Sequence, residues 1–166
     1  ALFAPRRGKG YRGRMNIIIE GPDGSGKSTL VRYFELRGWE LAPRACTSEG
    51  GPLGHGDMMR WLHESLSWDG RVIDRHPILS GHVYDHVLGR ETLPRWSADY
   101  LRPVLRRSIA VYCRPPSPVI VDAASRAPQL EGVLRNLGRI IDEYDRLFRI
   151  IPAIHYDWTR DDLPDL

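Results

Sequence analysis

The chain has 166 residues, of which 42% are hydrophobic and 27% charged, a balance typical of one globular domain with its own core. Its apolar runs are only a few residues long, which argues against a membrane span, so we expect no membrane partner. The two cysteines, Cys46 and Cys113, are too few for a disulfide framework and favour a reducing, cytoplasmic location.

The formal net charge is +3 and rests almost entirely on arginine, since Lys9 and Lys27 are the only lysines. Arginine holds phosphate through paired hydrogen bonds, although a GC-rich genome would enrich it equally well. Residues 1–14 are basic, contain no acidic residue and lack the apolar centre of a signal peptide. We therefore exclude them from the fold as a disordered or non-native tail before Met15, with a nucleic-acid-binding arm as the alternative.

A phosphate-binding loop opens the predicted domain. The apolar run Asn16–Glu20 predicts a buried strand, and the next residues, GPDGSGKST, match the P-loop pattern G-x-x-x-x-G-K-[ST]. Its glycines let backbone N–H groups surround an anion, Lys27 adds charge for the terminal phosphates, and the Ser28 hydroxyl suits Mg²⁺. We thus expect ATP and Mg²⁺ as cofactors, with the nucleotide bound by Asp23, Gly24, Ser25, Gly26, Lys27, Ser28 and Thr29.

The elements after this loop alternate between helix and strand. The P-loop helix continues to about Gly38, and residues 39–42 predict a short strand. Residues 47–56 are too rich in glycine for regular structure and predict a functional loop. Asp57 then begins a helix whose apolar residues recur at helical spacing.

A second functional position lies at the end of the next predicted strand, residues 70–75. In a parallel sheet, a carboxylate at the carboxyl end of a neighbouring strand can hold Mg²⁺ beside the P-loop hydroxyl. Asp74 has that place, and its neighbour Arg75 would reach the same phosphates. The alternative is a surface turn after the strand.

The second half of the chain predicts further helices and two more strands. Residues 76–108 read as two or three short helices, with Tyr84 lining either a base pocket or the core. Residues 108–113 predict the fourth strand, and residues 119–128 fit either a short strand or a turn of helix. Residues 130–148 predict one amphipathic helix with a solvated polar face that carries Glu131, Arg135, Arg139 and Glu143. Residues 149–156 predict an edge strand, followed by a loosely held acidic tail.

This order of elements predicts a doubly wound α/β fold of the P-loop kinase type, with a parallel five-stranded sheet and helices on both faces. We expect a single domain over residues 15–166, with a short lid around residues 115–135.

The motifs together resemble those of thymidylate kinases. Residues 17–30 (IIIEGPDGSGKSTL) are similar to the opening of these enzymes, residues 48–54 to their glycine-rich loop, and Asp74-Arg75 with Ser80 and Tyr84 to their third-strand signature. Two later segments, residues 112–116 and residues 131–145, resemble the small thymidylate kinase-like proteins of some bacteriophages. This resemblance implies the host cytoplasm as the location. The resemblance covers most of residues 15–156.

The resemblance also implies roles for single residues. Asp23 would contact the acceptor sugar, Asp74 would serve Mg²⁺ or its water shell, and Arg75 would bind the transferring or acceptor phosphate. Glu49, Tyr84 and Arg135 would also belong to the substrate-binding set. Gly24 stands where some relatives carry a catalytic arginine, so a lid arginine is expected instead, Arg126 first and Arg135 second. A proline-arginine element that holds thymine is not recognisable, and homodimers occur in the family.

Three functions follow as hypotheses. The first is ATP-dependent phosphorylation of a (deoxy)nucleoside monophosphate, dTMP or another dNMP, whose ionised phosphate needs no strong base to attack. The second is a deoxynucleoside kinase, whose hydroxyl acceptor does need one. The third is a P-loop kinase or ATPase that acts on nucleic acid through the basic tail, with steeply salt-dependent binding.

Overall fold

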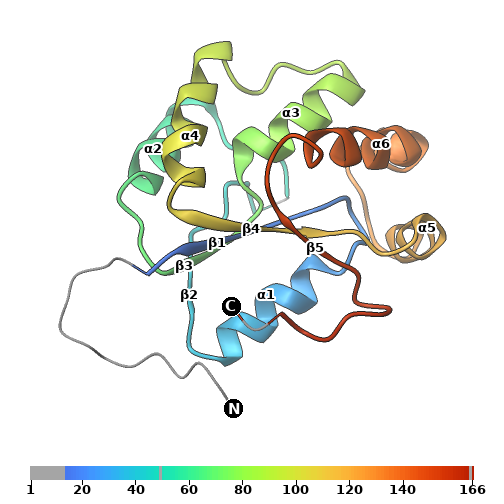
Figure 1. Ribbon diagram of the computed structural model, residues 1–166. Helices are drawn as coiled ribbons and strands as arrows, with labels where there is room; N and C mark the ends of the chain where they lie inside the picture. Colours follow the sequence, from blue (N-terminus) through green and yellow to red (C-terminus); the bar gives the residue numbers. More distant parts are fainter. Residues whose placement is uncertain (1–13, 49, 165) are drawn as a thin grey trace.

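A computed structural model describes residues 14–48, 50–164 and 166 of the chain (Figure 1). The predictions made for the tail before Arg14 and for Glu49 therefore lie outside the described residues. The strands are β1 Asn16–Glu20, β2 Glu40–Leu41, β3 Arg71–Asp74, β4 Ser108–Cys113 and β5 Ile154–Tyr156. The α-helices are α1 Lys27–Leu36, α2 His55–Ser65, α3 Pro77–Leu88, α4 Leu101–Leu105, α5 Ser117–Ser125 and α6 Leu137–Leu147, and the 3₁₀ helices are η1 Arg95–Tyr100 and η2 Leu134–Asn136.

The strands form one parallel sheet in the order β2-β3-β1-β4-β5. The P-loop strand β1 is thus central, with β3 and β4 as its neighbours. Ile19 pairs with both Asp74 of β3 and Val111 of β4, so the carboxyl ends of these strands meet beside the P-loop. This edge is where open parallel sheets bind their ligands.

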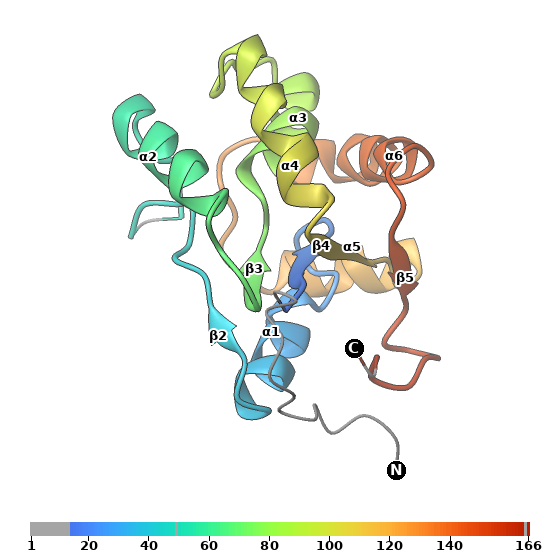
Figure 2. The same cartoon turned by 60° about the vertical axis from the view of Figure 1, so that its left-hand side comes forward.

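The three isoleucines of β1 are fully buried because helices cover both faces of the sheet. Ile17 and Ile19 pack with Leu30 and Phe34 of α1 on one face. Ile18 packs on the other face, in the larger core built with α2, α3, α4 and α6. Figures 1 and 2 show these four helices on the side of the sheet opposite α1. The predicted fold class is confirmed.

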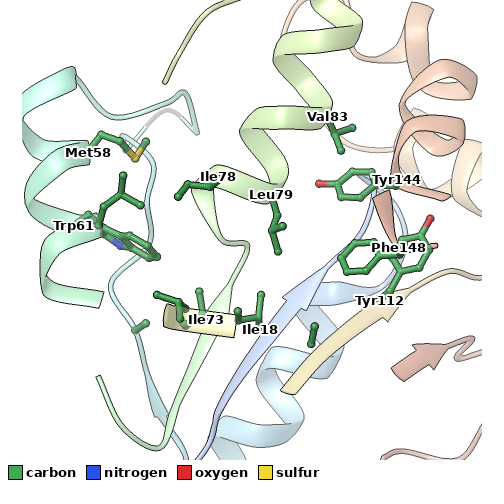
Figure 3. Packing of buried hydrophobic residues seen from close by; sticks show 14 of the residues in the cluster. Ile18, Met58, Trp61, Ile73, Ile78, Leu79, Val83, Tyr112, Tyr144 and Phe148 are labelled. Carbon is green, nitrogen blue, oxygen red and sulfur yellow. The ribbon is translucent and has the colours of Figure 1, made fainter. Parts of the chain in front are cut away.

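Aromatic residues hold α6 against the sheet in this larger core (Figure 3). The rings of Tyr112 on β4 and Phe148 after α6 stack with centroids 4.5 Å apart, and Tyr144 stacks on Tyr112 at 6.1 Å. A smaller cluster, formed by Ile120, Ala124, Leu137 and Ile141, joins α5 to α6. Among the described residues, no helix has the length and apolar content needed to cross a bilayer.

The prediction of one helix over residues 130–148 is wrong at its start. Residues 131–133 form a turn in which Gly132 has a φ of +82°, and η2 follows before α6 begins at Leu137. Glu131 and Arg135 therefore precede α6. Glu143 is not on a solvated face either, because it is only 6% exposed and pairs with Arg146 and with two histidines of α3.

Residues 119–128, which fitted either a short strand or a turn of helix, belong mainly to α5, whose first turn contains a proline where the missing N–H costs nothing. Other boundaries differ from the predictions. The helix expected to begin at Asp57 begins at His55, so Asp57 lies in its first turn. The last strand begins only at Ile154, because residues 148–151 form a turn. The tail after it is not loose at its start, since Asp157 is buried and accepts hydrogen bonds from Thr159. Residues 76–108 form α3, η1 and α4, as predicted.

Candidate active site

The P-loop connects β1 to α1 and provides an anion site. The first N–H groups of a helix have no intrahelical partner, and the positive end of the helix dipole points at the same place. Gly24 has a φ of +82°, and a Cβ there would lie 2.5 Å from the carbonyl oxygen of Ile120 on α5. With α5 in this position, a side chain at residue 24 would collide with the α5 backbone, so this structure leaves no room for an arginine there.

Lys27 is drawn into the loop rather than into solvent. Its side chain is buried, and Nζ donates to the carbonyl oxygen of Pro22 at 2.6 Å and to Ser25 Oγ at 3.5 Å. Burial lowers the pKa of Lys27 to about 8, with the positive charge of Arg75 acting in the same direction. A bound phosphate chain would stabilise the charged form, since an anion beside an ammonium group raises its pKa.

Asp74 closes the opposite side of the loop. It lies at the carboxyl end of β3 and lines the same cavity as Lys27 and Ser28. Arg44, which follows β2, places Nε 3.5 Å from Asp74 Oδ2. The Ser28 hydroxyl and the Asp74 carboxylate are oxygen donors of the kind that Mg²⁺ prefers. In the described part of the chain, no group of three or more His, Cys, Asp or Glu residues could hold a metal ion by itself. In nucleotide sites Mg²⁺ is commonly bound by one or two protein groups together with waters and substrate phosphates.

Asp23 of the P-loop, Arg75 after β3 and Tyr84 of α3 form a hydrogen-bonded triad that lines the cavity. Arg75 forms an ion pair with Asp23 and donates from Nη1 to the Tyr84 hydroxyl at 3.1 Å. Tyr84 in turn donates to Asp23 Oδ2 at 2.7 Å. Burial would raise the pKa of Asp23, but the charges of Arg75 and Lys27 outweigh it and lower that pKa on balance. Asp23 is therefore an ionised, fully engaged carboxylate.

Glu20, directly before the P-loop, is a buried polar residue that sequence reasoning did not select. Its Oε1 accepts from the backbone N–H of His76 at 2.6 Å, and its Oε2 accepts from the Tyr144 hydroxyl at 3.2 Å. Burial raises the pKa of Glu20 to about 7, against the lowering effect of Arg75 and Lys27. A charged residue directly after three isoleucines of a buried strand was the available signal for it.

These groups line one cavity of about 1020 Å³, which is at the upper end of the size range of small-molecule sites. The predicted residues Asp23, Gly24, Gly26, Lys27, Ser28, Thr29, Asp74, Arg75 and Tyr84 all line it. Ser25 does not, but its buried hydroxyl contacts Lys27. Residues that sequence reasoning missed also line it, namely Arg44, Arg90, Thr92, Tyr156 and Trp158.

The structure does not bring the two predicted lid arginines into this cavity. Arg126 ends α5 with its side chain 74% exposed, and Nη2 lies 2.6 Å from Asp122 Oδ2. Arg135 is exposed on η2. Arg90, which follows α3, does line the cavity and donates from Nη2 to the carbonyl oxygen of Glu131 at 3.0 Å. It therefore links the cavity to the segment predicted to act as a lid.

The sequence matches no protein-family model and no curated protein, but solved structures share its fold. The YorR protein from Bacillus subtilis, in complex with phosphorylated GDP, has a TM-score of 0.66 at 18% identity, over 86% of this chain and 84% of its own. Shikimate kinase from Acinetobacter baumannii, in complex with shikimate, has a TM-score of 0.53 at 21% identity, over 87% and 83%. Deoxyadenosine kinase from M. mycoides, with dCMP and dCDP bound, has a TM-score of 0.53 at 16% identity, over 89% and 92%. At these identities the likeness shows the fold alone, and that fold is the α/β fold of P-loop kinases.

Proposed function

We propose that the protein is an ATP-dependent kinase that phosphorylates a (deoxy)nucleoside monophosphate, dTMP or another dNMP, to the diphosphate. The observation that carries the proposal is a cavity with a P-loop on one wall and the guanidinium groups of Arg44, Arg75 and Arg90 around the rest. Phosphoryl transfer needs mainly positioning and positive charge on the phosphate oxygens. This cavity offers both.

The donor triphosphate would bind residues 21–29, with Lys27 on its terminal phosphates. Ser28 and Asp74 would hold Mg²⁺, which when bound neutralises charge that develops on the bridging and leaving oxygens. Arg75, held by Asp23 and Tyr84, would stabilise the equatorial oxygens of the transferred group. Its guanidinium is oriented before the substrate arrives, so little side-chain entropy is lost on binding.

The carboxylates of the cavity support a phosphate acceptor over a hydroxyl acceptor. A hydroxyl needs a general base, that is, a free carboxylate within reach of its proton. Asp23 is paired with Arg75, and Asp85 accepts from the Thr92 N–H and hydroxyl at 2.8 and 2.7 Å. Asp74 alone has only a long contact, with Arg44 at 3.5 Å. A monophosphate attacks as an anion, and Arg75 and Arg44, which face Asp23 and Asp74, would attract it.

A deoxynucleoside kinase is the second candidate. Asp74 favours it, because its bond to Arg44 is long at 3.5 Å and Arg44 is 68% exposed, so this carboxylate could be released to act as a base.

A coupled assay with ATP and Mg²⁺ against the common nucleoside monophosphates, the nucleosides and shikimate tests the proposal. We expect turnover with at least one monophosphate and none with nucleosides. Lys27→Ala should lower the rate about 10³- to 10⁵-fold if the lysine stabilises transition-state charge. Turnover of nucleosides alone would establish the second candidate, and unchanged turnover of Lys27→Ala would end the kinase proposal.

A further inference from the structure

A rigid turn follows β5 and carries Trp158 to the P-loop. Asp157 is buried and accepts from the Thr159 N–H at 3.0 Å and its hydroxyl at 2.6 Å. The Asp157 N–H donates to Asp161 Oδ2 at 2.7 Å, and Arg160 Nε pairs with Asp157 Oδ2 at 2.7 Å. Hydrogen bonds on both sides of position 158 thus fix the backbone from which the indole projects.

The indole of Trp158 lies directly on the P-loop backbone. A Cβ built on Gly26 would lie 2.7 Å from its Cδ1 and 2.8 Å from its Nε1, so the ring is in contact with the residue before Lys27. Trp158 lines the cavity beside Thr29 and Tyr156 and is still 47% exposed. A half-exposed aromatic ring held at a binding site is a surface available for a ligand.

The position of this ring corresponds to one end of a donor nucleotide. The acceptor wall, with Asp74 and Arg75, lies on the β3 side of β1, whereas Trp158 follows β5, on the other side of β1 in the sheet order. A triphosphate held by the P-loop must point its terminal phosphate at the acceptor wall. Its nucleoside therefore extends the other way, toward α1 and the segment after β5.

We propose that Trp158 is the platform on which the base of the donor nucleotide stacks, an inference that rests on the proposed kinase function. Every base has a π-face, so stacking on an aromatic ring favours binding without selecting one base. The hydrogen bonds and the ion pair described for this turn join residues 157–161 to one another. Stacking alone would then hold the base, so we expect purine nucleoside triphosphates to bind with similar affinity.

Calorimetric titration of ATP, GTP and inorganic tripolyphosphate, each with Mg²⁺, into the wild type, Trp158→Leu and Trp158→Phe tests the inference. Loss of stacking should weaken ATP and GTP binding to the leucine variant about 5- to 150-fold, as expected for removal of one base–aromatic contact. Tripolyphosphate has no base, so its affinity should change less than about twofold. Trp158→Phe should keep most of the wild-type affinity. Ile150→Ala, which shortens another exposed apolar side chain outside the cavity, is the control.

Three outcomes would overturn the inference. Equal loss of ATP and tripolyphosphate affinity in Trp158→Leu would mean that the indole only supports the loop. Tighter binding of both would mean that it covers the phosphate site, and unchanged affinities would mean that it contacts no ligand. Because binding is measured without turnover, a wild type that fails to bind ATP at all would instead count against the proposed function.

Discussion

Arg75 is the one non-glycine residue in the described ranges with a positive φ, +67°. Its N–H donates to the carbonyl oxygen of Ile19 at 3.0 Å, and its side chain is held by Asp23 and Tyr84, so contacts at both ends keep the backbone in this conformation. A left-handed conformation costs a residue with a Cβ about 1 to 2 kcal/mol. The guanidinium is thus aimed into the cavity at the expense of local stability.

This strain can be measured by comparing Arg75→Ala with Arg75→Gly. Both variants lose the guanidinium, but only glycine relieves the steric conflict at positive φ. We expect the free energy of unfolding of Arg75→Gly to exceed that of Arg75→Ala by about 1 kcal/mol. Urea denaturation at one pH gives this difference directly.

The matched control is the same pair of substitutions at Arg32, an exposed position inside α1. There the order should reverse, because glycine in a helix interior is about 1 kcal/mol less stable than alanine. If alanine were the more stable residue at both positions, the backbone at position 75 would be relaxed and no strain would be stored there.

Single residues were predictable from sequence where a motif or a strand end sets their position. Lys27 and Ser28 follow from the P-loop spacing, and Asp74 and Arg75 from the end of a parallel strand next to it. Arg44, Arg90 and Trp158 lie in connecting segments, where no periodicity indicates the direction of a side chain. Their place in the cavity depends on long-range packing, which the local pattern does not contain.

At the level of elements, the start of α6 shows how an apolar pattern can mislead. Apolar residues recur at helical spacing in this segment, at Leu130, Val133, Leu134 and Leu137. The structure buries Val133 and Leu137, four residues apart, but it does so with a turn followed by η2 and not with one helix. The interruption lies at Gly132, whose φ of +82° ends any continuous helix. A glycine within a helical pattern was the available signal, but its backbone conformation was not readable from sequence.

Two glycines test this boundary by opposite responses to the same substitution. Gly132→Ala should lower the free energy of unfolding by about 1 kcal/mol, because alanine at positive φ is strained although the nearest atom, Leu88 Cδ2, leaves room at 3.5 Å. Gly138→Ala, inside α6 and with no atom within 4 Å of the new Cβ, should raise it by about 0.5 to 1 kcal/mol. Chemical denaturation of the two variants beside the wild type measures both values.

One continuous helix over residues 130–148 would give a different result. In that case both positions would have helical φ, and alanine would stabilise the protein at each of them. Stabilisation by Gly132→Ala would therefore restore the helix boundary that the sequence pattern predicted and contradict the turn.

For the whole molecule, the parallel α/β architecture was predictable because three consecutive isoleucines form the centre of β1 and strands alternate with helices along the chain. The order of the strands was not, since β1 and β3 pair over about fifty residues of intervening chain with no local signal for the pairing. Glu20 and His76 join these parts in the interior. The His76 N–H donates to Glu20, whose other oxygen accepts from Tyr144 of α6.

The two buried groups make opposite contributions to the pH dependence of stability. Burial raises the pKa of Glu20 to about 7 from 4.5, so its stabilising contribution is full below pH 4.5 and is lost as the pH rises through 7. Burial lowers the pKa of His76 to about 3 from 6.5, so its contribution is full above pH 6.5 and is lost as the pH falls. Between pH 6.5 and 4.5 the two effects oppose each other.

We therefore expect the wild-type free energy of unfolding to change little between pH 6.5 and 5. Each single substitution removes one of the two opposing effects, so the pH dependence that the other group causes becomes measurable. Glu20→Gln leaves the histidine effect, so its stability should fall by about 1 to 2 kcal/mol as the pH is lowered over this range. His76→Asn leaves the carboxyl effect and keeps an acceptor for the Ile78 N–H, so its stability should rise by a similar amount. Urea denaturation of the three proteins at pH 6.5, 5.75 and 5 measures the slopes. Other titrating groups are common to all three proteins, so their effects cancel in the comparison. If the free energy of unfolding changed with pH in the same way in all three, neither side chain would be shielded from water. The buried link between β1, α3 and α6 would then be open to solvent.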